Sequence, residues 1–258
     1  RGIEETVASA VIAAPGGVPI GAIADRQGFR FDDTTQYPER TLIDETFVGG
    51  TGLDYSGGYP EVVAWVGAEY HIYYSDQRRA RGALSTDGGI TWQQFGGTTP
   101  DMFGGEIAVS AVDPNVLVWL PTHFADPWEY LRDPVGVYYS YDGGQTWTHT
   151  ESVAGIDSFH RFMWWFNRRA LAADRVNGNF YLMSDEGRFF TSSDNAATWQ
   201  EAANAPPCLD ANACHVLGQL QAHPDRAERL WAGVGIEGLY RSDDAGRSAW
   251  IKLPGVDE

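Results

Sequence analysis

A short motif recurs along this chain at nearly constant spacing, and no other feature limits the possible folds as strongly. Four segments align, each with serine at its first position, aspartate at its third and tryptophan at its end. Their aspartates lie 55, 52 and 50 residues apart, and a fixed period of this length is typical of repeat architectures. The segments are STDGGITW (85–92), SYDGGQTW (140–147), SSDNAATW (192–199), which has Ala196 in a glycine position, and SDDAGRSAW (242–250), which has one extra residue before its tryptophan.

The residues between the motifs alternate short strands with turns. In one period, IAVSA (107–111) and VLVWL (116–120) are rich in β-branched and aromatic residues and flank the turn VDPN. VGVYYS (135–140) and TWTHT (146–150) then flank the motif itself. Four short antiparallel strands per period match one blade of a β-propeller, and no segment has the periodicity of a helix. The sequence therefore predicts an all-β propeller with four-stranded antiparallel blades.

Counting outward from the motifs divides the chain into about five blades. The N-terminal segment has no motif, but ETVASAVIAA and VPIGAIAD, on either side of PGG, have the character of two further strands. No strand at either end has an obvious partner at the other, so the chain is either a five-bladed propeller or most of a larger one. It begins at Arg1 rather than methionine, and we expect it to be processed or a portion of a longer polypeptide. Residues 1–258 form one propeller domain in this interpretation, with blades at about 1–48, 49–101, 102–168, 169–213 and 214–258.

The motif has the chemistry of a tight turn rather than of an active site. An aspartate can accept hydrogen bonds from the amides of its own turn, and glycines allow the positive φ that a tight hairpin requires. The threonine and tryptophan are expected on the last strand of each blade, where the indole can pack between blades and donate its N–H. We therefore assign a structural role to Asp87, Trp92, Asp142, Trp147, Asp194, Trp199, Asp244 and Trp250.

The charge balance excludes several classes of partner. The chain has 18 Lys and Arg against 35 Asp and Glu, a net charge of −17. A surface this acidic repels nucleic-acid phosphates and anionic lipids, so no nucleic acid is expected to bind. No run of 18 apolar residues is present, and no membrane insertion is expected.

Cysteine and histidine spacing bears on the compartment and on metals. Cys208 and Cys214 lie six positions apart in the loop-like segment PPCLDANAC. A disulfide between them would indicate an oxidising compartment, and the alternative is two free thiols. The six histidines show no metal-ligand spacing such as H-E-x-x-H, and no glycine-rich phosphate loop follows a strand and opens a helix. No metal site and no cofactor are expected.

The motif resembles the Asp-box, the bacterial neuraminidase repeat found in sialidases, sortilin-type receptors and family 74 glycoside hydrolases. Sialidases need an arginine triad and usually an Arg-Ile-Pro segment, whereas this chain has no Arg-Ile-Pro and is too acidic to attract an anionic sugar. The rest of the sequence resembles the second propeller domain of the family 74 enzymes, which are xyloglucanases. The resemblance is carried, in order, by GIEETVASAVIAAPGGVPIGAIADRQGFRFDD, TGLDYSGGYPEVVAWVG, GGEIAVSAVDPNVLVW, LAADRVNGNFYLM and GLYRSDDAGRS.

This resemblance implies an endo-acting, inverting glucanase built from two seven-bladed propellers with the substrate cleft between them. Such an enzyme uses two carboxylates, one from each domain, about 6.5–9.5 Å apart so that a water molecule fits between them. The family's Gly-Asp-x-x-Gly-Phe motif reads ADRQGF (24–29) here, which makes Asp25 the implied general acid. The strand pattern places Asp25 at the end of a second strand, entering a long loop on the ligand rim, with the motif turns on the opposite rim. The nearby Asp32 and Asp33 are expected to form turns.

The sequence departs from the family pattern at two positions. Ala24 replaces the glycine before the aspartate, and Phe31 replaces the histidine after Gly-Phe-x. The second carboxylate would come from a propeller domain that this chain lacks. Two functions therefore stay open. One is a secreted, extracellular or periplasmic hydrolase-like propeller that acts on or binds a xyloglucan-type polysaccharide; the other is a non-catalytic extracellular propeller that binds a protein or a glycan.

Two aromatic segments, DPWEY (126–130) and FHRFMWWFNRR (159–169), fall in loops on the expected ligand rim. Aromatic faces beside polar groups suit stacking on sugar rings. The alternative is packing against a missing domain or a partner chain, because the second segment is unusually apolar for a loop in solvent. The candidates for substrate binding are Trp128, Tyr130, Trp164 and Trp165. The tryptophans expected in the core are Trp65, Trp119 and Trp231.

Overall fold

A computed structural model gives the architecture of the chain. The structure describes residues 7–24, 26–43, 49–68, 80–99, 102, 104–121, 136–150, 170–184, 187–207, 218–234 and 237–255. The elements in this part of the chain are nineteen β-strands in five antiparallel sheets. None of the described residues belongs to a helix long and apolar enough to cross a membrane.

Neighbouring strands along the chain pair with one another in every sheet, and the first sheet has three strands where the others have four. The first three sheets are β1 (Ala8–Ile12), β2 (Ile20–Ile23) and β3 (Arg26–Arg30); β4 (Gly50–Tyr55), β5 (Val63–Ala68), β6 (Ala80–Ser85) and β7 (Gln93–Gln94); and β8 (Glu106–Val109), β9 (Leu117–Leu120), β10 (Tyr138–Ser140) and β11 (Thr148–His149). The last two are β12 (Leu171–Ala173), β13 (Phe180–Met183), β14 (Phe189–Ser192) and β15 (Gln200–Glu201); and β16 (Gly218–Ala222), β17 (Leu230–Val234), β18 (Leu239–Ser242) and β19 (Ile251–Lys252).

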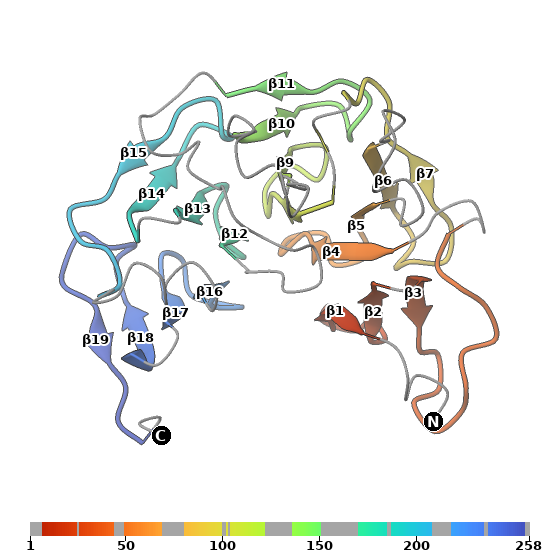
Figure 1. Cartoon of the computed structure of the whole chain (residues 1–258), viewed down its shortest axis with the longest axis horizontal. Coiled ribbons are helices and arrows are strands. Elements are labelled where there is room, and N and C mark those ends of the chain that lie inside the picture. Colours follow the sequence, from red (N-terminus) through yellow and green to blue (C-terminus); the bar gives the residue numbers. More distant parts are fainter. Residues whose placement is uncertain are drawn as a thin grey trace, which may run out of the picture.

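The five sheets follow one another around an arc, like blades around an axis (Figure 1). The innermost strands β1, β4, β8, β12 and β16 contact one another in that order, and the sheets fan outward from them. The sheets β1–β3 and β16–β19 lie at the two ends of the arc, and their described strands do not pair with each other. The predicted all-β propeller of about five blades is confirmed, and its completion to a seven-bladed ring stays a prediction.

The hydrophobic core is divided among the interfaces between neighbouring sheets. Successive side chains of a strand point to opposite faces, so one strand can serve two interfaces. In β5, Val63 and Trp65 pack against the first sheet, whereas Ala64 and Val66 pack against the third. Each of the four interfaces has a cluster of this kind. This double burial explains why the inner strands read as nearly continuous apolar runs.

Two of the three strand tryptophans lie in the core, as predicted. Trp65 and Trp119 are fully buried, and each indole N–H is donated to a backbone carbonyl. The prediction is wrong for Trp231, which is only half-buried and stacks on His223 with ring centroids 5.0 Å apart. Trp231 lies on the face of the last sheet that has no neighbouring sheet among the described residues, whereas its strand neighbours Leu230 and Ala232 are buried.

The four motif segments form turns of one kind, called box turns below. In the turn at 85–92, Asp87 Oδ1 accepts hydrogen bonds from the N–H of Thr91 at 2.8 Å and from the Ser85 hydroxyl at 2.8 Å. Asp87 Oδ2 accepts the Thr91 hydroxyl at 2.6 Å, and the N–H of Gly89 is donated to Ser85 Oγ. Burial opposes the charge on Asp87, but these hydrogen bonds outweigh it and lower its pKa to about 2. The predicted bonding of the aspartate to its own turn is therefore present.

The backbone of the box turns is left-handed at two successive residues. Gly88 and Gly89 have φ of 72° and 84°, a conformation that costs glycine little. In the third turn Asn195 and Ala196 adopt φ of 61° and 66°, so the repeat keeps this conformation without glycine. Ala245 does the same in the fourth turn, with φ of 53°.

The box tryptophans pack between blades, as predicted, but they do not lie on the last strand. Each fourth strand begins after the tryptophan, so the threonine or serine and the tryptophan belong to the turn itself. Trp147 makes an edge contact with Phe95 of the preceding sheet, at a centroid distance of 5.2 Å. Three of the four indoles donate to a carbonyl; Trp199 Nε1 is buried and has no partner among the described residues.

Candidate functional site

The position of the implied general acid in the sequence falls between two strands that pair with each other. β2 ends at Ile23, β3 begins at Arg26, and these two residues pair with each other. The sequence predicted a long loop after Asp25, which is wrong, because Arg26–Arg30 continues as a strand. Asp25 itself is outside the described residues, and its role stays a prediction.

The residues around this connection are held by hydrogen bonds to neighbouring strands. The N–H of Ala24 is donated to the carbonyl of Val7 at 2.8 Å. The Trp65 indole in β5 donates to the carbonyl of Gln27 at 2.7 Å, which ties the β2–β3 hairpin to the second sheet. Ser9 adds a second tie, because its hydroxyl lies 2.6 Å from the Gly50 carbonyl. The backbone on both sides of position 25 is thus fixed by the first two sheets.

Among the described residues of the ADRQGF segment, Gly28 is the one whose identity the backbone requires. Its φ is 132°, and a Cβ at this position would lie 2.0 Å from the carbonyl oxygen of Gly21 in β2. The pairing of β2 with β3 also shifts its register between Gly21 and Ile23. A side chain at position 28 would force the hairpin open.

Antiparallel strand order sets which rim each turn occupies. In a four-stranded meander, the connections between strands one and two and between strands three and four share one rim, and the connection between strands two and three lies on the other. The box turns occupy the first rim, which we call the box rim. The β2–β3 connection that contains position 25 lies on the opposite rim.

Phe31, which replaces the family histidine, follows β3 and lies on the box rim. Its ring stands edge-on to Phe29, with centroids 6.4 Å apart, and its N–H is donated to the carbonyl of Pro19. β3 rises about 3.3 Å per residue, which separates Phe31 from position 25 by roughly 20 Å. Asp33 also follows β3 and accepts the N–H and the hydroxyl of Thr35, so it forms a turn as predicted. Asp32 instead pairs with Arg30.

The other predicted site residues lie outside the described part of the chain. Their predicted roles, sugar stacking for the aromatic residues and a disulfide for the cysteines, stay predictions. They are Trp128, Tyr130, Trp164, Trp165, Cys208 and Cys214.

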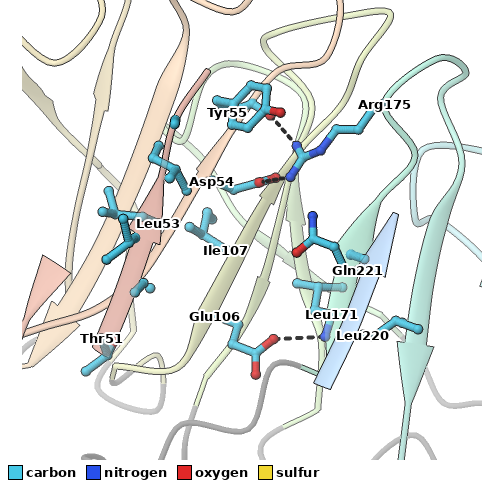
Figure 2. Close-up of a pocket in the computed structure, with 16 residues that line it drawn as sticks. Thr51, Leu53, Asp54, Tyr55, Glu106, Ile107, Leu171, Arg175, Leu220 and Gln221 are labelled. Carbon is cyan, nitrogen blue, oxygen red and sulfur yellow. Dashed lines mark hydrogen bonds and ion pairs between the residues drawn. The ribbon is translucent and has the colours of Figure 1, made fainter. Parts of the chain in front are cut away.

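A cavity of about 230 Å³ lies along the axis of the arc, between the innermost strands of all five sheets. Figure 2 shows Asp54, Tyr55 and Arg175 at one end of this central cavity and Glu106 with Leu171 toward the other. Leu220 and Gln221 contribute from the last sheet. The strand and turn pattern of the sequence did not predict this cavity or its charged residues.

A buried ion pair closes the central cavity at the box rim. Arg175 Nη2 lies 2.6 Å from Asp54 Oδ1, and both side chains are only 8% exposed. Asp54 Oδ2 accepts the N–H of Val109, and the Arg175 guanidinium lies over the Tyr55 ring at 4.3 Å and donates to the Tyr55 carbonyl. Burial acts against the charge on Arg175, but the adjacent Asp54 carboxylate prevails and raises the arginine pKa. The pair joins the second sheet to the fourth, past the third.

Glu106 joins the third sheet to the fourth at the opposite end. Its two carboxylate oxygens accept the N–H groups of Ala170 and Leu171 at 2.9 Å and 2.8 Å. The charged groups of the central cavity are therefore engaged in holding the sheets together, and we assign the cavity a structural role. Among the described residues, no group of three or more His, Cys, Asp or Glu is placed to hold a metal ion.

One member of this ion pair, Asp54, stands out in the sequence. Asp54 stands inside the strand segment TGLDYS, and a charged residue within a buried strand needs a partner. Its partner Arg175 follows a different strand, 121 positions away, in the turn of LAADRVNG. The sequence offered no way to join the two.

Comparison with known proteins shows similarity to xyloglucanases, and the similarity extends over nearly the whole chain. A xyloglucanase of Paenibacillus is 26% identical over 264 residues, which cover 100% of this chain and 23% of the relative. An oligoxyloglucan-reducing end-specific xyloglucanase of Emericella nidulans is 27% identical over 269 residues, 99% of this chain and 31% of the relative. The chain thus spans between about a quarter and a third of the length of these relatives. No family model matches it.

A solved structure agrees with these relatives. A family 74 glycoside hydrolase of Niastella koreensis superposes with a TM-score of 0.72 and 25% sequence identity, over 98% of this chain and 31% of that one. The predicted resemblance to family 74 propellers is confirmed.

Proposed function

We propose that this chain is a propeller portion of a glycoside hydrolase that acts on a xyloglucan-type β-glucan. Asp25 is its general acid, and the second carboxylate of the inverting pair comes from a propeller outside this chain. The observation that carries the proposal is the similarity to xyloglucanases along 100% of the chain at 26% identity.

The surroundings of position 25 suit a general acid. An acid must be held within hydrogen-bond reach of the glycosidic oxygen, and fixed elements hold a group more accurately than free loops do. The described residues on either side of position 25 are anchored, because Ala24 donates its N–H to Val7 and Gln27 accepts the indole N–H of Trp65. The β2–β3 connection lies on the rim opposite the box turns.

The two departures from the family pattern do not argue against this role. Phe31 follows the far end of β3, so whichever residue stands there acts on the packing of the box rim and not on the chemistry at position 25. Ala24 is fully buried and makes a backbone hydrogen bond, so its methyl group is accommodated. The proposal also includes a secreted location, extracellular or periplasmic, since a polymeric glucan is met outside the cell.

The test is the release of reducing sugar from xyloglucan by the full native polypeptide and by its Asp25→Asn variant. Loss of a general acid lowers the rate by about 10²- to 10⁴-fold, and we expect a loss of that size. Asp113→Asn is the matched control. Asp113 is a turn carboxylate on the box rim that caps Asn115, and asparagine can make the same bond, so its rate should not change.

Equal rates for the native protein and Asp25→Asn would remove Asp25 from the mechanism. No release from any glucan by the native polypeptide would leave the non-catalytic binding propeller as the function.

A further inference from the structure

The first sheet departs from the repeat at the box rim, and the departure creates a groove. After β3, residues 31–41 replace a box turn, and Thr41 returns to form an isolated bridge with Phe29 where a fourth strand would run. The segment lies against the box turn of the second sheet. Arg30 connects the two, because its Nε donates to the carbonyl of Gly88 at 2.9 Å.

The groove between this segment and the neighbouring box turn measures about 590 Å³, more than twice the central cavity. That size falls in the range of small-ligand sites, about 300–1,000 Å³. Its residues from the 31–41 segment include Phe31, Gln36, Tyr37, Glu39 and Arg40, and Ile90 of the box turn lines the other side.

The segment that forms the groove is held in place before any ligand binds. Asp33 accepts two hydrogen bonds from Thr35, which also lower the pKa of the Asp33 carboxyl. The N–H of Phe31 is bonded to Pro19 at one end, and that of Leu42 is bonded to Gly28 at the other. A binding surface ordered in advance loses less conformational entropy when a ligand arrives.

The exposed side chains of the groove combine an aromatic face with both kinds of hydrogen-bonding group. Tyr37 is 56% exposed and Ile90 is 49% exposed, so both sides of the groove present apolar surface to solvent. Gln36 and Arg40 supply N–H donors, and Glu39 and Gln36 supply acceptor oxygens. A sugar ring presents an apolar face with hydroxyl groups around its edge, and this combination matches it.

The charge of the protein narrows the choice of glycan. At −17, the chain repels anionic polysaccharides, whereas a neutral glucan carries no charge to be repelled. We propose that the groove formed by residues 31–42 and the box turn at 89–90 is a second binding site for a neutral β-glucan chain, on the rim opposite Asp25. This inference rests on the proposed function and adds to it a site that holds polymer without reacting with it.

The experiment measures the affinity of the native polypeptide for xyloglucan by affinity electrophoresis, in an Asp25→Asn background so that the polymer stays intact. Tyr37→Ala should weaken retention about tenfold, because a stacked aromatic ring is lost. Tyr37→Phe should restore it, since the ring rather than the hydroxyl makes the contact. Tyr59→Ala is the matched control, because Tyr59 is 41% exposed on the same rim but does not line the groove.

Retention of Tyr37→Ala equal to that of the parent would overturn the second site. If release of sugar still depended on Asp25, the proposed function would stand without it. If xyloglucan did not retain the parent protein and the native protein released no sugar, both the second site and the proposed function would be rejected. Self-association in sedimentation experiments that disappears with Tyr37→Ala, without glucan retention, would assign the groove to a second copy of the chain and reject a glycan site.

Discussion

The first sheet and the four sheets that follow it are built from the same kind of strands but end differently at the box rim. In the later sheets a serine and an aspartate saturate the turn with hydrogen bonds, as Ser140 and Asp142 do. The first sheet has no such turn at that rim and has the longer segment at 31–41 in its place, whereas position 25 falls between β2 and β3, on the opposite rim. The complete repeats use their turn residues to hold the fold, whereas the first sheet, which lacks the box turn, contains the groove and the position to which we assign glucan binding and acid catalysis as proposals.

The largest effect is expected from glycine substitutions that compare these two regions. Gly28→Ala in the first sheet would place a Cβ 2.0 Å from the Gly21 carbonyl, and we expect a loss of at least about 3 kcal/mol in unfolding free energy. Gly88→Ala in the box turn of the second sheet meets nothing within 4 Å, and its φ of 72° should cost about 1 kcal/mol. The test is to measure the urea unfolding midpoints of the two variants, and Gly28→Ala should unfold at the lower urea concentration. Equal midpoints would mean that the hairpin relaxes freely, and that position 25 is not fixed.

The buried ion pair joins the second and fourth sheets and does not include the first. Arg175→Ala leaves Asp54 buried without its partner, and we expect a loss of about 3–5 kcal/mol. Arg247→Ala is the control: Arg247 pairs with Glu228, but its side chain is 62% exposed, so the loss should stay below about 1 kcal/mol. Hydrogen exchange adds a spatial test, since amides of β4 and β12 should lose protection more than those of β2. Uniform loss in all three strands would show that the arc unfolds as one unit.

The smallest effect concerns the pH dependence of a box turn. Because the pKa of Asp87 is lowered from 3.8 to about 2 in the folded protein, its ionised form adds stability above about pH 4, and that stability is lost as the pH falls toward 2. Asp87 is partly exposed, so solvent screening keeps the effect below about 1 kcal/mol. The midpoint temperature of thermal unfolding should therefore fall less steeply between pH 5 and pH 2 for Asp87→Asn than for the native protein. If the midpoint temperatures of the two proteins changed in parallel with pH, ionised Asp87 would not stabilise the box turn.

Sequence reasoning reached the box turns because their hydrogen bonds close within a few residues. Asp87 bonds to Ser85 and Thr91, all inside one eight-residue segment, so residue identity and order were enough. It failed at β3, where the charged Arg26 and Arg30 and the glycine between them resemble a loop. Pairing with β2 overrides that local preference.

The sequence alone determined the repeat, the strand and turn order, the all-β propeller and the family it resembles. The tertiary structure decided which faces of the strands form the four interfaces, which rim each end of β3 reaches, and the pairing of Arg175 with Asp54 across 121 positions. It also brought the 31–41 segment against Gly89 and Ile90 to form the groove. The physical reason is the sequence separation of the residues in contact. The hydrogen bonds of a turn join residues close together in the chain, whereas buried ion pairs and grooves depend on how the blades are placed around the axis.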